Sequence, residues 1–161
     1  MQTLFRNLVE TFARSSDLLC AFSEDGLTAD IAVEGLHFAL GLSIESGLLI
    51  VQTAVADAPA EGDPGRDLFL AAALRENNLF QGSRGFTLGL DEENLITLQY
   101  ARPIEGFTDE AFGALMANFA SAAIEEMGKL SRIRTESEAQ GLASRSADDL
   151  PNRPGFAGIP V

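Results

Sequence analysis

Hydrophobic residues recur along the first segment of the chain with the spacing of an α-helix. One stripe is formed by Leu4, Phe5, Leu8, Val9 and Phe12. Such a stripe is typical of a helix that packs one face on a core. The pattern predicts an amphipathic helix over residues 3–15, which the sequence Ser15-Ser16-Asp17 ends.

From residue 27 the hydrophobic period changes to two, which is the period of a β-strand. Alternation predicts one strand over residues 28–33, with Ile31 and Val33 on its apolar side, and another over residues 38–44. Residues 48–55 are apolar on both sides, which suits a central strand. The links between these strands are short, so we expect an antiparallel meander.

A second helix is predicted over residues 66–80, after a loop rich in Pro and Gly. Its apolar residues cover more than one face, which is typical of a helix buried both against its own sheet and against a second subunit. A helix enclosed in a single core is the alternative. The candidate dimer contacts are Leu68, Phe69, Leu70, Leu74, Leu79 and Phe80.

Two further strands and a third helix complete the pattern. Alternation predicts strands over residues 86–90 and 95–100, and Pro103 ends the second of them. Thr108 provides an N-cap for the third helix, and the apolar spacing continues to Leu130, about twenty residues further on. The resulting order is α-β-β-β-α-β-β-α. It predicts an α+β fold in which helices cover one side of a five-stranded antiparallel sheet.

Length and composition indicate one domain that needs no disulfide or metal for stability. The chain has 161 residues, 46% of them hydrophobic, and its one cysteine, Cys20, has no internal disulfide partner. We assign residues 1–130 to the domain and expect residues 131–161, a polar segment with Pro and Gly, to form a flexible tail. No apolar run approaches the ~20 residues of a membrane span. The first residues also lack a secretory signal pattern, so we expect a cytoplasmic protein without membrane insertion.

Net charge excludes some classes of partner. Residues 1–130 contain 20 Asp or Glu and 7 Lys or Arg, whereas residues 131–161 contain four of each sign. The acidic surface expected on the domain repels nucleic acid and anionic membranes, and it tolerates basic or mixed-charge polypeptides. Because solubility alone explains such acidity equally well, the charge does not select a function.

The residues that catalysis requires are scarce. His37 is the only histidine, which excludes a two-histidine metal site. A nucleophilic Cys20 would need a base, and only His37 could serve, but nothing in the sequence places it near Cys20. The Gly-rich stretch at residues 82–89 lacks the Lys-Ser/Thr of a phosphate-binding loop and precedes a strand. We therefore predict no catalytic residue, metal or cofactor, and expect a binding protein. A catalytic pair of carboxylates is the alternative left open.

The order of elements resembles the class I chaperones of bacterial type III secretion, the Tir-chaperone (CesT-like) family. The resemblance covers about residues 1–130 and includes the amphipathic first helix. It also includes the local sequences Ser23-Glu24-Asp25-Gly26, Ala73-Leu74-Arg75-Glu76-Asn77-Asn78-Leu79-Phe80, Phe86-Thr87-Leu88-Gly89-Leu90-Asp91 and Leu95-Ile96-Thr97-Leu98.

The resemblance implies a homodimer that binds the N-terminal segment of a secreted effector and keeps it soluble and ready for export. It implies no cofactor, and it places helix 66–80 in the dimer contact. The candidate effector-binding residues are Phe5, Leu8, Val9, Phe12, Ile31, Val33, Leu88, Ile96, Leu98 and Tyr100. The alternative is a YbjN-like regulatory or stress-associated domain that binds no effector.

Overall fold

The computed structural model describes residues 1–33, 35–77 and 84–148, with side chains as far as Ser144. Its elements follow the predicted order with one addition. In chain order they are α1 (Gln2–Ser15), β1 (Cys20–Phe22), β2 (Thr28–Val33), β3 (Leu36–Ser43), β4 (Leu48–Asp57), α2 (Arg66–Glu76), β5 (Thr87–Leu90), β6 (Leu95–Pro103) and α3 (Asp109–Asp148).

The strands form one antiparallel sheet in the order β1-β2-β3-β4-β6-β5. The predicted meander is confirmed, because β2, β3 and β4 pair in sequence order. The expected five strands are wrong by one, since β1 joins the edge of the sheet by pairing Cys20 with Ile31. A strand of three residues is too short to reveal a period of two in the sequence.

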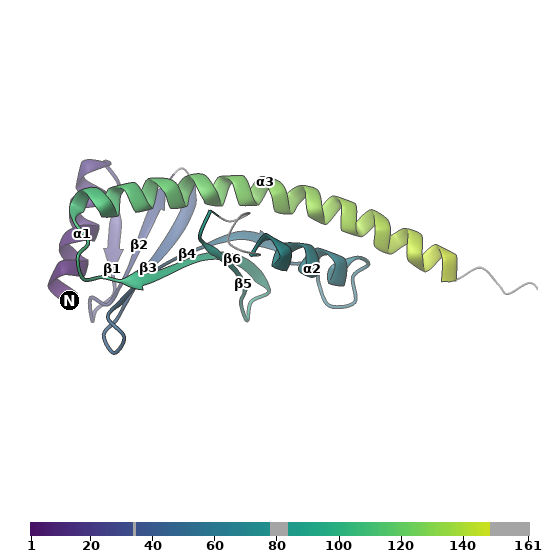
Figure 1. The fold of residues 1–161 in the computed structure, drawn as a ribbon, viewed down its shortest axis with the longest axis horizontal. Helices are drawn as coiled ribbons and strands as arrows, with labels where there is room; N and C mark the ends of the chain where they lie inside the picture. The colour runs from purple at the N-terminus through teal and green to yellow at the C-terminus, as the bar shows by residue number, and fades with distance from the viewer. Residues whose placement is uncertain (34, 78–83, 149–161) are drawn as a thin grey trace, which may run out of the picture.

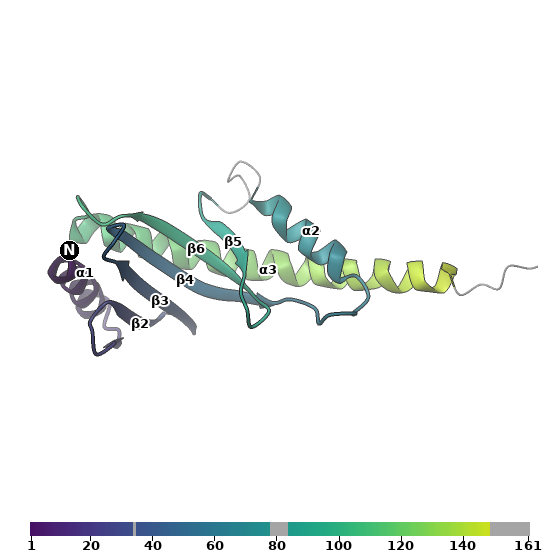
Figure 2. The same ribbon diagram turned by 90° about the horizontal axis from the view of Figure 1, so that it is seen from below.

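The helices cover one face of this sheet. Helix α3 runs along the face and past the end of the sheet (Figure 1), and when the molecule is seen from below the strands lie in front of it (Figure 2). Helix α1 contacts α3 and β1, whereas α2 contacts α3 and β5. The two shorter helices therefore occupy opposite ends of the molecule.

The core forms where the apolar side of the strands meets the helices. Phe38 of β3 and Phe119 of α3 pack edge to face with ring centroids 5.5 Å apart, and Phe86 packs on Phe119 at 5.1 Å. The largest side chains with almost no exposed surface are Phe5, Phe38, Phe69, Phe112, Phe119, Leu8, Ile31, Leu40, Leu49, Leu98, Ile104 and Met116. Alternation thus predicted the buried side of the strands, except at the strand ends, where Ile44 and Leu90 are exposed.

Helix α3 is longer than the apolar pattern predicts. It has 40 residues and ends at Asp148, whereas the sequence pattern stops at Leu130. Beyond Leu130 its inner face continues at helical spacing through Ile133, Ser137 and Gly141, and Ser137 is buried. Side chains this small let the backbone at Gly65 pass directly against the helix. The apolar period is lost because this contact is made by small residues.

Helix α2 ends at Glu76. The predicted helical residues Leu79 and Phe80 lie outside the described part of the chain. Among the described helices, none is long and apolar enough to cross a membrane.

Candidate functional site

Most of the predicted effector-binding side chains belong to the core. Seven of the ten are at most 5% exposed, namely Phe5, Leu8, Val9, Ile31, Leu88, Ile96 and Leu98. Their own chain already covers them, so their role in the described conformation is packing. The binding prediction is carried forward by the three that remain half-buried, which are Phe12, Val33 and Tyr100.

Phe12 and Val33 lie together in an open groove between α1 and α3. We call this the α1–α3 groove; its volume is about 560 Å³ and its lining consists of Phe12, Ser16, Leu18, Val33, Met116, Ala117, Ala120, Ser121 and Ile124. The Phe12 ring is fixed edge to face on Phe112 at 5.8 Å. Ile124 is 49% exposed, so the groove offers apolar surface that this chain leaves uncovered.

The predicted dimer residues divide between the core and the surface. Phe69 has no exposed surface and packs in the core, so it is unavailable to a second subunit. In contrast, Leu68 is 45% exposed and Leu74 is 67% exposed. Leu70 is half-buried between them. The surface of α2 thus keeps apolar residues on the side away from Phe69.

A small apolar cavity lies between this helix and the last two strands. We call it the leucine pocket; it has a volume of about 120 Å³ and is lined by Leu70, Ala73, Leu74, Leu88, Gly89, Leu90 and Ile96. Leu90 at its rim is 48% exposed. The pocket brings together Leu70 and Leu74 from the dimer prediction with Leu88 and Ile96 from the effector prediction.

Polar side chains fix the beginning of α2. The Arg66 guanidinium donates to the Asn94 side-chain oxygen at 2.9 Å and to the Pro59 carbonyl. Asn94 in turn donates from its amide to the Ala58 carbonyl at 2.8 Å. Because Asn94 lies in the turn between β5 and β6, these bonds tie the start of the helix to the sheet.

The end of α2 is fixed by a side chain that imitates a neighbouring strand. Asn77 accepts from the Leu88 backbone N–H at 2.7 Å and donates to the Leu88 carbonyl at 2.9 Å. Leu88 belongs to β5, the edge strand, so the amide occupies backbone groups that would otherwise face outward. The leucine pocket is therefore held between two polar attachments.

A charged cluster joins α2 to α3. The Lys129 ammonium lies 2.8 Å from Glu126, 3.3 Å from Glu125 and 3.7 Å from Glu76. Burial alone would lower the pKa of Lys129, but the contacts with Glu126 and Glu125 outweigh it and hold that pKa above its usual value. The cluster therefore has a structural role, in keeping the two helices together.

The residues considered for chemistry lie apart from these surfaces. His37 is exposed on β3, and its carbonyl accepts a hydrogen bond from Thr53 at 2.8 Å. Cys20 is half-buried in β1 with a free thiol. Within the described residues, no three His, Cys, Asp or Glu side chains gather as a metal site would require.

The sequence of the chain matches a known protein family. The model of the Tir chaperone protein (CesT) family matches residues 7–126. The chain belongs to this family. No curated protein matches the chain by sequence.

Solved structures with the same fold agree with the CesT assignment. The HopA1-SchA chaperone–effector complex gives a TM-score of 0.57 at 20% identity, covering 80% of this chain and 94% of that chain. The ExsC-ExsE complex gives 0.60 at 22% identity, with 76% and 90% covered. The Yersinia pestis type III secretion chaperone SycH, in complex with a stable fragment of YscM2, gives 0.55 at 16% identity, with 74% and 97% covered. The predicted CesT-like fold is therefore confirmed.

Several residues of these surfaces were missed in the sequence. Met116, Ala120 and Ile124 line the α1–α3 groove, yet in the sequence they continue the apolar stripe of α3. The stripe is wider than the core requires, and its width was the available signal. The pairing of Asn77 with Leu88 had no sequence signal, because it depends on where β5 lies.

Proposed function

We propose that this protein is a cytoplasmic, non-enzymatic type III secretion chaperone. It binds the N-terminal segment of an effector and keeps that segment soluble and competent for export. The observation that carries the proposal is an acidic, CesT-family chain with two separate apolar surfaces, the α1–α3 groove and the leucine pocket. The complexes formed by SchA and SycH, which share the fold, support it.

The α1–α3 groove has the properties needed to receive a foreign chain. It is wide, and its lining mixes apolar side chains with Ser16 and Ser121, whose hydroxyls can satisfy polar groups of the cargo. An unfolded segment gains affinity by spreading many apolar contacts over such a surface, which offsets the entropy lost on ordering.

An extended part of the cargo is best accommodated at the β1 edge. Strand β1 ends the sheet on the α1 side, and strand addition uses unpaired backbone groups at such an edge. The opposite edge, β5, is already occupied at Leu88 by the Asn77 amide. The β1 edge is also close to α1, so one segment can use both the edge and the groove.

The exposed surface of α2 favours a second copy of the chain as its partner. Leu68 and Leu74 project from a helix held at both ends, and the leucine pocket lies beside Leu74. A rigid apolar surface of this kind suits a permanent, self-complementary contact. We therefore propose a homodimer through α2.

Purification of the tagged protein from its native cell, followed by mass spectrometry of the retained proteins, tests the proposal. We expect a secreted protein that is retained through its N-terminal segment, and a complex containing two copies of the chaperone by sedimentation equilibrium. Recovery of no secreted protein, with the chain behaving as a stable dimer alone, would instead favour a YbjN-like domain. A monomer at micromolar concentration would contradict the dimer.

A further inference from the structure

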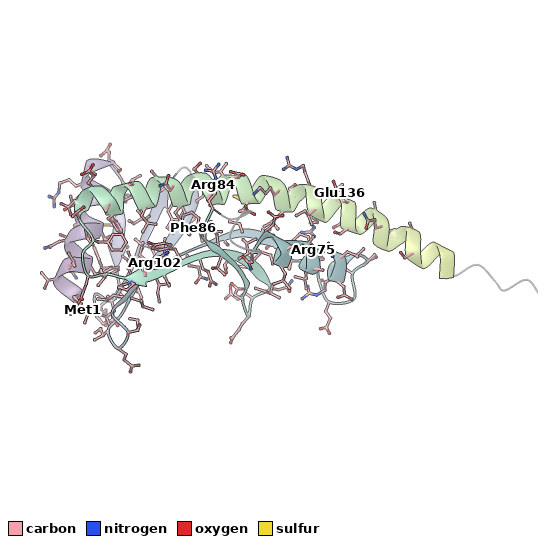
Figure 3. The ribbon with its side chains drawn as sticks, in the orientation of Figure 1. Met1, Arg75, Arg84, Phe86, Arg102 and Glu136 are labelled. Carbon is pink, nitrogen blue, oxygen red and sulfur yellow. The ribbon has the colours of Figure 1, made fainter. Side chains whose placement is uncertain are left out.

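A third cavity differs from the two apolar surfaces in carrying positive charge. It has a volume of about 380 Å³ and is lined by Arg84, Gly85, Phe86, Tyr100, Arg102, Leu115 and Asn118. We call it the basic pocket. Figure 3 labels Arg84 beside α3, Phe86 below it and Arg102 on β6. Its lining contains two arginines and no acidic residue, in a chain whose net charge is −13.

The two arginines are in different electrostatic situations. Arg84 lies 2.6 Å from Glu125 and within 3.5 Å of the Ser121 hydroxyl, so its charge is largely compensated. Arg102 is exposed on β6, and within the described residues no carboxylate pairs with it. Arg102 therefore provides the uncompensated charge of the pocket.

The floor of the pocket is aromatic and well ordered by its contacts. Tyr100 packs edge to face on Phe86 at 5.8 Å, and Phe86 packs in turn on Phe119 at 5.1 Å. Phe86 is 6% exposed, and Tyr100 is half-buried. The lining therefore combines hydrogen-bond donors, from Arg102, the Asn118 amide and the Tyr100 hydroxyl, with the apolar surface of Phe86 and Leu115. Such a combination suits a carboxylate next to an aliphatic group.

The basic pocket and the α1–α3 groove lie on opposite flanks of α3. At about 100° of rotation per residue, Leu115 and Asn118 face away from Ala120 and Ile124. A helix with its side chains is about 10 Å across. About three or four extended residues cross that width. A segment that leaves the groove can therefore reach the pocket over Ser121.

We propose that the basic pocket binds a Glu or Asp side chain of the partner polypeptide, with an aliphatic neighbour on the aromatic floor. The inference rests on the proposed function and specifies its cargo: an acidic residue follows or precedes the groove-bound apolar residues by a few positions. Elsewhere the acidic surface repels such a residue, so the pocket fixes the register of the segment.

The test uses two synthetic peptides, Ac-Ser-Leu-Glu-Leu-Ser-NH2 and the same peptide with Gln in place of Glu. Each is titrated to millimolar concentration into the full-length ¹⁵N-labelled protein, and the arginine Nε–Hε signals are followed by NMR. We expect the Glu peptide to shift the Arg102 signal and the Gln peptide to leave it in place. The Arg132 signal is the internal control, because Arg132 is exposed on α3 away from the pocket.

Variants provide the second readout. Arg102→Gln should weaken binding of the Glu peptide about fivefold, whereas Arg132→Gln, with the same loss of charge, should leave it unchanged. Equal shifts of Arg102 by both peptides, or equal weakening by both variants, would overturn the inference, as would no shift at all. Capture of an effector from the cell by an Arg102→Gln variant at wild-type yield would also overturn it while leaving the proposed function intact. If the Glu peptide binds but no effector is captured, the proposed function fails instead.

Discussion

The two ends of this molecule are held together in different ways. At the α1 end most contacts involve aromatic rings: Phe5 packs on Phe22 at 6.2 Å, and Phe12 packs on Phe112 at 5.8 Å. One polar bond, from the Gln2 side chain to the Asp25 carbonyl, accompanies them. At the α2 end the helix is attached by polar bonds from Arg66 and Asn77 to backbone groups of other segments. Apolar packing tolerates small rearrangements, whereas directional hydrogen bonds do not.

This difference suggests that the two ends bind different partners. The α1 end has the wide groove and an edge strand of three residues, which suits a cargo segment of variable sequence. The α2 end has a small pocket and exposed leucines on a fixed helix, which suits a second copy of the same chain.

The double change Leu68→Asp and Leu74→Asp should abolish the dimer. Both side chains are exposed in the single chain, so folding should survive, but two carboxylates would be buried in an apolar contact. We expect the dimer to be weakened by at least about 3 kcal/mol, or more than about a hundredfold. Sedimentation equilibrium at micromolar concentration measures this.

The control for the dimer is Ile44→Asp, which places one such carboxylate on a residue that is 53% exposed between β3 and β4. It should remain dimeric. If the double variant also remains dimeric, α2 is not the dimer contact.

Ile124→Asp should weaken cargo binding and leave the dimer intact. Ile124 is 49% exposed in the α1–α3 groove, so its replacement removes apolar contact there without opening the core. We expect about 2 kcal/mol, or about thirtyfold weaker binding of the effector segment, measured by calorimetry. Leu142→Asp, on the same helix and 58% exposed, should bind cargo like the wild type. Equal binding by the two variants would remove the groove from the cargo site.

The elements at the two ends could largely be predicted from the sequence, but the roles of their individual residues could not. The stripe on α1 was visible as an amphipathic helix, yet Phe5, Leu8 and Val9 face the core and only Phe12, at its margin, reaches the groove. A period reveals that one face is buried, and it does not reveal whether the chain itself or a partner buries it.

Contacts between distant segments were the other limit. The pairing of Asn77 with Leu88 requires the position of β5, and the course of α3 beyond Leu130 depends on small residues rather than on an apolar stripe. Glu, Ala, Gln and Arg in that stretch have good helix propensity, but composition alone did not distinguish a helix from a polar tail.

Asn77→Ala should destabilise the α2 end more than the α1 end. The change removes both hydrogen bonds to Leu88 and leaves part-buried backbone groups unpaired, which costs about 1–2 kcal/mol of unfolding free energy. Asn77→Asp should not restore stability, because a carboxylate oxygen would then face the Leu88 carbonyl. Hydrogen exchange should show faster exchange in β5 and unchanged exchange in β2. Equal acceleration in both strands would contradict a local attachment.

Two Gly→Ala changes on α3 should have opposite signs. In a helix Ala is about 1 kcal/mol more favourable than Gly. Gly128 has open space where a Cβ would project, so Gly128→Ala should raise the free energy of unfolding by about that amount.

At Gly141 a Cβ would overlap the backbone of Gly65 and Pro64, in the loop that leads into α2. Gly65 adopts a φ of +83°, which an L side chain rarely occupies, so the loop has little freedom to withdraw. Gly141→Ala should therefore lower the free energy of unfolding despite its better helix propensity, and denaturant titration measures both changes. If Gly141→Ala stabilises the protein as Gly128→Ala does, the far part of α3 is not packed on this loop, and this contact does not help to hold the α2 end.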